Sequence, residues 1–299
     1  MQAPRASSGL CRRKEATPLL SPRSRGERHL GTARRAKLIY ALKLSIFDHM
    51  ATLPLLTPLA SPVYFVSDAH LGAALIPNPQ DQLARLDRLL DRVLAGGKTL
   101  VLAGDLFDFW YEWRHVIPKQ PFHVLHRLRT LVENGVSVHY LAGNHDFRLR
   151  GFLEGEVGLH VHGEALSAEV AGQSVYVFHG DGLLARDRGY RLMKRVLRNR
   201  AAQRLFSWLH PDCGMALARG TSITSRTLVK EDADEDRDYL AHARAKFAEG
   251  YQAVVLGHTH RPVEHVEGER VYVNLGDWIT HYSFGLHDGL RLGLHYLKS

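Results

Sequence analysis

The sequence is poor in cysteine and lacks long apolar runs. Only Cys11 and Cys213 occur among its 299 residues, too few for a disulfide framework or a cysteine-rich metal site, which is typical of a reducing compartment. No stretch approaches the roughly 18 consecutive apolar residues of a membrane-spanning helix, which excludes an integral membrane protein but not one bound at a membrane surface. With 45% hydrophobic and 23% charged residues, we expect a folded cytoplasmic protein of one or two domains.

An evenly spread excess of positive charge is also missing, although the formal net charge is +8. Residues 1–50 hold 11 Lys or Arg against three acids, which accounts for the whole excess, and the other 249 residues carry 28 charges of each sign. Because nucleic-acid binding needs clustered Lys and Arg, this balance argues against a nucleic-acid partner.

The N-terminal segment has no sustained apolar period and is rich in Arg, Ser and Pro, which predicts a disordered basic extension over residues 1–60. Three origins stay open: a segment translated upstream of a true start at Met50, a solvated basic tail, or an organelle-targeting peptide. A regular pattern begins at residue 61, so the folded domain is expected to span residues 61–299.

From residue 61 onwards, short apolar runs alternate with segments of helical periodicity. Strands are expected at 63–66, 99–103, 136–142, 174–178 and 253–256, and helices near 83–93, 120–133 and 231–248. Such alternation indicates a parallel sheet with covered faces, whose ligands gather at the carboxyl ends of the strands. The apolar positions between residues 263 and 297 predict antiparallel strands that add to a second sheet.

Every one of these strands ends in residue types that bind metals. They are Asp68, His70, Asp105, Asn144, His179, His258 and His260. Carboxylate, amide and imidazole ligands together suit manganese, iron, zinc or cobalt, and seven are too many for one ion. The sequence therefore predicts two adjacent metal ions.

Each signal by itself has an ordinary structural explanation. Asp68 is a suitable cap for the turn that follows it, and Gly104-Asp105 is common turn chemistry. His258 and His260 alternate along an extended segment, so both can face one site, but paired histidines also occur at surfaces. Five such signals at successive strand ends are hard to explain as independent accidents, and together they favour a metal site.

Taken in order, the motifs resemble the calcineurin-like metallophosphoesterase superfamily, and within it the LpxH-type UDP-2,3-diacylglucosamine diphosphatases. They are Asp68-x-His70, Gly104-Asp105-x-x-Asp108, Gly143-Asn144-His145-Asp146, His179-Gly180-Asp181 and Gly257-His258-Thr259-His260, with "HGDGLLARDRGY", "GHTHRPVEH" and "VNLGDW". The resemblance covers about residues 62–280. It implies a four-layer α-β-β-α sandwich, two stacked mixed sheets flanked by helices, with an inserted helical lid.

The resemblance also implies roles for the ligands. It places Asp68, His70 and His260 on one metal ion, Asn144, His179 and His258 on the other, and Asp105 between them. Two ions about 3.5–4 Å apart can share a hydroxide and clamp a phosphoryl oxygen. His145, which stands where the best-known LpxH-type enzymes have Arg, is expected to stabilise the transition state or protonate the leaving group.

For other residues near the motifs, the sequence allows two interpretations each. Asp108, Asp146 and Asp181 can orient metal-bound imidazoles or only stabilise turns. Phe107, Phe109, Trp110 and Trp113 are candidates for lining a substrate entrance, with core or rim packing as the competing reading.

Residues 182–230 carry 11 basic residues and two acids, and their apolar positions recur roughly at helical spacing. One reading is an inserted helix with a solvated basic face, and the other is a face for an anionic ligand or membrane. This segment stands where the resembled enzymes carry their lid. The resemblance makes Tyr190 a substrate contact, with Arg186, Arg191, Lys194, Ser222 and Arg226 as weaker candidates. After the lid, residues 231–238 hold six acids, for which a helix start is favoured over a third metal site.

The expected function is hydrolysis of the diphosphate of UDP-2,3-diacylglucosamine to UMP and 2,3-diacylglucosamine 1-phosphate, a step of lipid A synthesis. Two divalent ions, manganese first, are the expected cofactors. The partners expected from the resemblance are this amphiphilic lipid and the cytoplasmic face of the inner membrane, reached through the basic lid. Another phosphoesterase, acting on a nucleotide, soluble diphosphate or phosphoprotein, and a non-catalytic scaffold are the alternatives.

Overall fold

The computed structural model describes residues 53–298 apart from 75, 150, 184–194, 196–198, 218–219 and 221–232. The chain divides into two units, residues 1–50 and 51–299, and every described residue belongs to the second. No helix among the described residues is long and apolar enough to cross a membrane.

The first of two six-stranded sheets is built around the parallel strands β2, β3, β5 and β7. Its strands, in spatial order, are β14 (Leu292–Tyr296), β13 (Ser283–His287), β2 (Val63–Val66), β3 (Thr99–Leu102), β5 (Ser137–Leu141) and β7 (His160–His162). β13 pairs antiparallel with β2. The carboxyl ends of β2, β3 and β5 therefore meet at one edge of this sheet.

The second sheet has the parallel strands β9, β10 and β12 at its centre. Its spatial order is β1 (Thr57–Leu59), β8 (Ala165–Val170), β9 (Gln173–Phe178), β10 (Ala253–Leu256), β12 (Arg270–Leu275) and β11 (Pro262–Glu267). A short ribbon pairs β4 (Trp110–Tyr111) with β6 (Asp146–Arg148).

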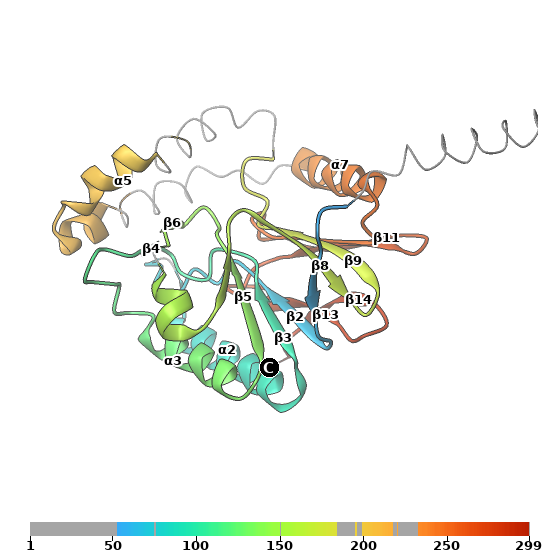
Figure 1. The fold of residues 1–299 in the computed structure, drawn as a ribbon, viewed down its shortest axis with the longest axis horizontal. Coiled ribbons are helices and arrows are strands. Elements are labelled where there is room, and N and C mark those ends of the chain that lie inside the picture. Colours follow the sequence, from blue (N-terminus) through green and yellow to red (C-terminus); the bar gives the residue numbers. More distant parts are fainter. Residues whose placement is uncertain are drawn as a thin grey trace, which may run out of the picture. The chain divides into compact units, whose positions relative to one another are not determined.

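Helices cover the outer faces of the two sheets (Figure 1). They are α2 (Pro79–Gly96), α3 (Phe122–Glu133) and the π-helix η1 (Leu153–Val157) on the first sheet and α7 (Ala233–Glu249) on the second, whereas α5 (Arg200–Ser207) lies apart from both sheets (Figure 1). Asn78 caps α2 by accepting from the Asp81 amide at 3.1 Å, and the stripe Leu86, Leu89 and Val93 is buried.

Three hydrophobic layers hold the molecule together. The first sheet packs on α2 and α3, the two sheets pack on each other, and the second sheet packs on α7. The middle layer contains Phe65 and Val101 from one sheet and Val177 and Val255 from the other, all fully buried. This arrangement confirms the expected α-β-β-α sandwich.

Two expectations need correction. Ordered structure begins before residue 61, because Thr57–Leu59 form β1, which pairs parallel with β8 and buries Leu59. The C-terminal strands do not all join one added sheet: β11 and β12 extend the sheet of β10, whereas β13 and β14 extend the sheet of β2. Both results depend on pairings between distant segments, which apolar periodicity does not specify.

Within the expected lid, α5 is helical and residues 211–217 are helical as well. The substrate candidates Arg186, Tyr190, Arg191, Lys194, Ser222 and Arg226 lie outside the described residues. Residues 1–52 of the expected N-terminal extension do so too.

Candidate metal centre

All seven expected metal ligands lie just after the carboxyl end of a parallel strand. Four follow strands of the first sheet: Asp68 and His70 after β2, Asp105 after β3 and Asn144 after β5. The other three follow strands of the second sheet: His179 after β9, and His258 and His260 after β10. The site is therefore assembled from both sheets.

The backbone at these positions is unusual. Among the described residues, seven non-glycine residues have positive φ, and five of them are expected ligands: Asp68, His70, Asp105, His258 and His260. Each such residue costs about 1–3 kcal/mol, so it persists only where its surroundings enforce it. This concentration of strain at one place indicates a functional site.

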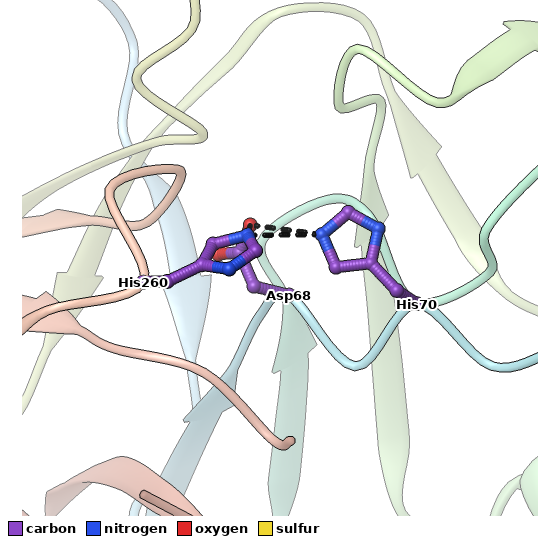
Figure 2. A group of neighbouring side chains, drawn as sticks. All are labelled: Asp68, His70 and His260. Carbon is purple, nitrogen blue, oxygen red and sulfur yellow. Dashed lines mark hydrogen bonds and ion pairs between the residues drawn. The ribbon is translucent and has the colours of Figure 1, made fainter. Parts of the chain in front are cut away.

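Asp68, His70 and His260 form one compact group (Figure 2). The Nε2 atoms of His70 and His260 are 3.1 Å apart, and they lie 3.7 and 3.3 Å from Asp68 Oδ1. Two imidazole nitrogens and one carboxylate oxygen thus converge on a common point.

The environment of Asp68 supports a cation at that point. Its Oδ2 accepts a hydrogen bond from the His258 amide at 2.9 Å, whereas its Oδ1 is buried and accepts no hydrogen bond among the described residues. A buried carboxylate oxygen without a hydrogen bond is costly unless a cation compensates it. The residues therefore fit a divalent metal ion.

A second group contains Asp105, His179 and His258. His179 donates through Nδ1 to the carbonyl oxygen of Ala103 at 2.9 Å, which turns its Nε2 toward Asp105 Oδ2 at 3.3 Å. The amide oxygen of Asn144 lies 2.9 Å from the same Nε2. This group has the mixed oxygen and nitrogen composition expected of the second metal ion.

Asp105 lies between the two groups. Its Oδ2 is 3.3 Å from His179 Nε2 in one group and 3.9 Å from His70 Nε2 in the other. Its Oδ1 accepts a hydrogen bond from the His145 amide at 2.8 Å, which fixes the carboxylate. This placement is the one that a bridging ligand needs.

The two buried carboxylates make the site strongly negative. Burial opposes ionisation of Asp105, but the neighbouring imidazoles of His179 and His145 outweigh burial and hold its pKa below the ordinary value. Burial also disfavours the charged form of His179, which by itself would lower the pKa of this imidazole. The charges of Asp105 and Asp68 outweigh burial and raise the pKa of His179 to about 10. The site therefore favours positive charge at the position where the ligands converge.

Asp146 contacts the turns that carry the ligands. It accepts hydrogen bonds from the amides of Gly143 and Asp105 at 2.9 and 3.3 Å and from the Tyr140 hydroxyl at 2.6 Å. Burial and the charge of Asp105 raise its pKa to about 6. Asp146 thus joins the turn after β5 to the turn after β3. These contacts favour turn stabilisation over the alternative role of orienting a metal-bound imidazole.

The other two acids left open in the sequence also lie at the site. Asp108 shares a group with His70 and His145, and its backbone carbonyl accepts from His145 Nδ1 at 2.6 Å. Asp181 is buried, and its charge acts to raise the pKa of His179.

Glycine is required where the ligand turns approach each other. A Cβ atom at Gly143 would collide with the Asp105 carboxylate and lie 2.7 Å from the Asp105 amide nitrogen. A Cβ atom at Gly257 would lie 2.7 Å from Asp68 Oδ2. No larger residue fits at either position without displacing a ligand.

The structure adds a residue that the sequence analysis missed. Gln82 is buried on α2, and its amide donates to the carbonyl oxygens of Ala69 at 2.6 Å and Trp278 at 3.1 Å. The Trp278 amide in turn donates to the Asp68 carbonyl at 3.1 Å. Gln82 thereby supports the Asp68–His70 loop. Its position four residues before Leu86, on the apolar stripe of α2, is the sequence signal that indicates a buried polar side chain.

The aromatic residues after β3 pack inside the protein. Phe107 and Trp110 belong to the core between the first sheet and its helices, whereas Phe109 and Trp113 form a cluster with Phe206. All four are at most 8% exposed. Their burial supports the packing reading.

Comparison with known proteins gives matches over most of the chain. The family model described as calcineurin-like phosphoesterase matches residues 61–262, a range that contains all seven expected ligands. A UDP-2,3-diacylglucosamine hydrolase from Porphyromonas gingivalis is 33% identical over 257 residues, which cover 80% of this chain and 98% of that protein.

A UDP-2,3-diacylglucosamine hydrolase from Pseudomonas putida is 32% identical over 222 residues, which cover 72% of this chain and 90% of that protein. Among solved structures, an archaeal phosphodiesterase aligns with a TM-score of 0.41 and 14% identity, over 79% of this chain and 99% of that one.

Proposed function

This chain belongs to the calcineurin-like phosphoesterase family and is a metal-dependent hydrolase, and we propose that it cleaves the diphosphate of UDP-2,3-diacylglucosamine. Water adds across the P–O–P linkage, and the products are UMP and 2,3-diacylglucosamine 1-phosphate, in lipid A synthesis. The observation that carries the proposal is the similarity to UDP-2,3-diacylglucosamine hydrolases over nearly their whole length, 98% in one case.

We propose that two divalent cations bind here, manganese being the first candidate. Asp68, His70 and His260 would hold one cation, and Asn144, His179 and His258 the other, with Asp105 shared by both. When bound, such a pair polarises the phosphate and makes water a competent nucleophile near neutral pH. The mixed ligand types also accept iron, zinc or cobalt.

The chain itself supplies the remaining chemistry. Asp105 is held as a carboxylate, because a hydrogen bond and two imidazoles favour its ionised form. His145 is oriented by its contact with the Asp108 carbonyl, and its Nε2 lies 3.9 Å from Asp105 Oδ2. We assign His145 the role of holding a proton for the leaving oxygen, which arginine cannot do because it does not exchange a proton near neutral pH.

Surface features of residues 199–217 support an amphiphilic substrate and a membrane partner. Phe206 and Met215 pack against the aromatic cluster of Phe109, Tyr111 and Trp113. Other apolar residues of the same segment are exposed to solvent: Leu205, Trp208, Leu209 and Leu217. Some side chains thus anchor this segment on the domain while others present apolar surface.

Basic residues lie beside this apolar surface. Arg204 is on the same helix, and the exposed Arg195 precedes it. Apolar side chains flanked by arginines are the pattern of segments that lie on anionic membranes. We propose that this segment places the enzyme on the cytoplasmic face of the inner membrane.

The proposed substrate contacts lie outside the described residues. Tyr190 is the first candidate, followed by Arg186, Arg191, Lys194, Ser222 and Arg226. Their cationic and hydroxyl side chains suit the phosphate and sugar groups of the substrate.

One observation keeps a second candidate function in view. His145 matches the wider family of phosphoesterases rather than the LpxH type, so another diphosphate or phosphodiester is the alternative substrate. Exposed Trp208 favours the lipid, because a soluble substrate gives no reason for an apolar face.

The test is release of UMP by the purified protein with manganese and UDP-2,3-diacylglucosamine in mixed micelles, compared with bis(p-nitrophenyl) phosphate and single-stranded DNA. We expect rapid cleavage of the lipid and of neither soluble substrate, abolished by Asp105→Ala and retained by Glu133→Gln, which alters a side chain on α3 that is 57% exposed. Faster cleavage of a soluble substrate would favour the second candidate, and lipid cleavage by Asp105→Ala would remove the bridging role.

A further inference from the structure

The acidic run at the start of α7 has a specific partner, Arg261. Its guanidinium Nη2 lies 3.2 Å from Glu235 Oε2 and 2.9 Å from Asp236 Oδ1. Arg261 follows the expected metal ligand His260 directly, so these ion pairs join α7 to the ligand loop. The side chains of Arg261 and Glu235 are 26% and 17% exposed, which shields this pair partly from solvent.

His260 needs such support more than the other members of its group. Its side chain is 34% exposed, whereas Asp68 and His70 are 0% and 2% exposed. Packing therefore restrains this imidazole less than it restrains the other two side chains, and the backbone must do more. That backbone has φ of 60°, a strained conformation that its surroundings must maintain.

Contacts tie the loop around His260 to other parts of the fold on both sides of this residue. Before His260, the His258 amide donates to Asp68 Oδ2 at 2.9 Å, which joins the loop to the turn after β2. Within the turn, the Thr259 amide donates to the Gly257 carbonyl at 2.9 Å. After His260, the Arg261 side chain connects the turn to α7.

Helix α7 is a rigid support for this purpose. Its residues Tyr239, Ala243 and Phe247 are buried against the second sheet. Tyr239 also donates from its hydroxyl to the carbonyl of Gly180 at 2.8 Å, next to the expected ligand His179. The first turns of α7 therefore contact both ligand loops of the second sheet.

We propose that Arg261 is a positioning residue for the metal centre: its ion pairs with Glu235 and Asp236 hold the His260 loop in its strained, ligating conformation. The inference rests on the proposed metal-dependent function. It gives Glu235 and Asp236 of the acidic run a role, which is to pair with Arg261. None of the described residues of this run belongs to a group of three potential metal ligands, and residues 231–232 lie outside the described part of the chain.

The direct test is calorimetric titration of the metal-free protein with Mn²⁺, without lipid. Residues that orient metal ligands typically contribute 10–100-fold to metal affinity, so we expect Arg261→Ala to weaken one of the two Mn²⁺ affinities by about that factor. Activity should then recover at saturating Mn²⁺. Arg261→Lys should restore part of the affinity, because it keeps one charge.

The matched control is Arg244→Ala. Arg244 lies on α7 and pairs with Glu267 on β11 at 2.6 Å, so this ion pair also joins α7 to the second sheet, but Arg244 is not adjacent to a ligand. We expect Mn²⁺ affinity to stay within twofold in this variant. Equal weakening by both substitutions would reduce Arg261 to a general structural role and overturn the proposal.

The partner side gives an independent variant should Arg261→Ala fold poorly. Glu235→Gln together with Asp236→Asn should weaken Mn²⁺ binding as Arg261→Ala does. When all three changes are combined, the fold-loss of Mn²⁺ affinity should be smaller than the product of the two separate fold-losses, because both variants break the same ion pairs. Unchanged affinity in the partner variant would overturn the proposal. Normal Mn²⁺ binding without cleavage of the UDP lipid in the wild type would instead contradict only the proposed substrate.

Discussion

The Nδ1 atom of His145 lies 2.6 Å from the backbone carbonyl oxygen of Asp108. Because a carbonyl only accepts, Nδ1 carries the proton of this hydrogen bond, and Nε2 is directed toward the metal centre, 3.9 Å from Asp105 Oδ2. The side chain is 14% exposed, so it can reach a ligand in the site. His145 is thus oriented for proton transfer without belonging to the expected metal ligands.

Replacing His145 by Gln should reduce turnover without removing the metals. Positioned acid–base groups contribute about 10²–10⁴-fold, so we expect kcat to fall within that range while the Mn²⁺ affinity of the protein stays unchanged. Steady-state kinetics and calorimetric metal titration measure the two quantities. His123→Gln, at a side chain 49% exposed on α3, is the control. A kcat within threefold of the wild type would exclude His145 from the chemistry.

Gly143→Ala should damage the site through a steric conflict. The added Cβ collides with the Asp105 carboxylate and backbone, so we expect a loss of about 1–3 kcal/mol in the free energy of unfolding, as for overpacked positions, together with weaker Mn²⁺ binding. Urea unfolding and metal titration are the measurements. Gly163→Ala, where a Cβ has no neighbour within 4 Å, should leave both nearly unchanged. Wild-type metal affinity in Gly143→Ala would show that Asp105 is not held as described.

A histidine cluster on β5 and β7 predicts acid sensitivity. His139 Nδ1 lies 2.9 Å from His162 Nε2, and the His160 ring lies 4.9 Å from the His139 ring. Burial first, then the charges of His162 and His160, lowers the pKa of His139 from 6.5 to about 4. The native state therefore binds fewer protons than the unfolded chain between these values, and its stability is lost as the pH falls from about 6.5 toward 4.

The variant His139→Gln should weaken this dependence, because glutamine does not titrate. The lowering of the pKa from 6.5 to about 4 sets an upper limit of roughly 3 kcal/mol. After allowing for partial solvent screening, we expect the variant to lose about 1–2 kcal/mol less unfolding free energy than the wild type between pH 7 and about 4.5. Urea unfolding at several pH values measures it. His210→Gln, at a side chain 70% exposed, should follow the wild type. Parallel curves for His139→Gln and the wild type would contradict the assignment.

Trp208→Ser should reduce binding to anionic vesicles. Trp208 is 83% exposed, and burying a large apolar side chain contributes about 1.5–3 kcal/mol, so vesicle affinity should drop about 10–100-fold. Sedimentation with vesicles containing phosphatidylglycerol measures the affinity. Leu290→Ser changes another apolar residue, 81% exposed between β13 and β14, and should have little effect. Equal losses in both variants, or no vesicle binding by the wild type, would count against this face.

Much of the site could be predicted because its ligands are tied to local sequence. Short apolar runs identified the strands, and a strand's carboxyl end is set by the chain itself, so Asp68, Asp105 and His179 were found from their position directly after such runs. Glycines beside the ligands carried the same local information: Gly143 and Gly257 stand where a side chain would strike a carboxylate.

Contacts between distant segments could not be predicted in this way. Nothing near Gln82 in the sequence indicates that its amide donates to Ala69 and Trp278, and nothing in the acidic run of α7 names Arg261 as its partner. The strand Thr57–Leu59 was missed for the same reason, since its stability comes from pairing with β8.

The sequence alone determined the alternation of strands and helices and the identity of the residues at the strand ends, because apolar periodicity and turn chemistry act over a few neighbouring residues. Only the tertiary structure decided that β2, β3 and β5 belong to one sheet and β9 and β10 to the other, and that Asp105 lies between the two ligand groups. The reason is physical: strand partners and side-chain convergence are settled by burial of surfaces from distant segments, and that free energy depends on the whole fold.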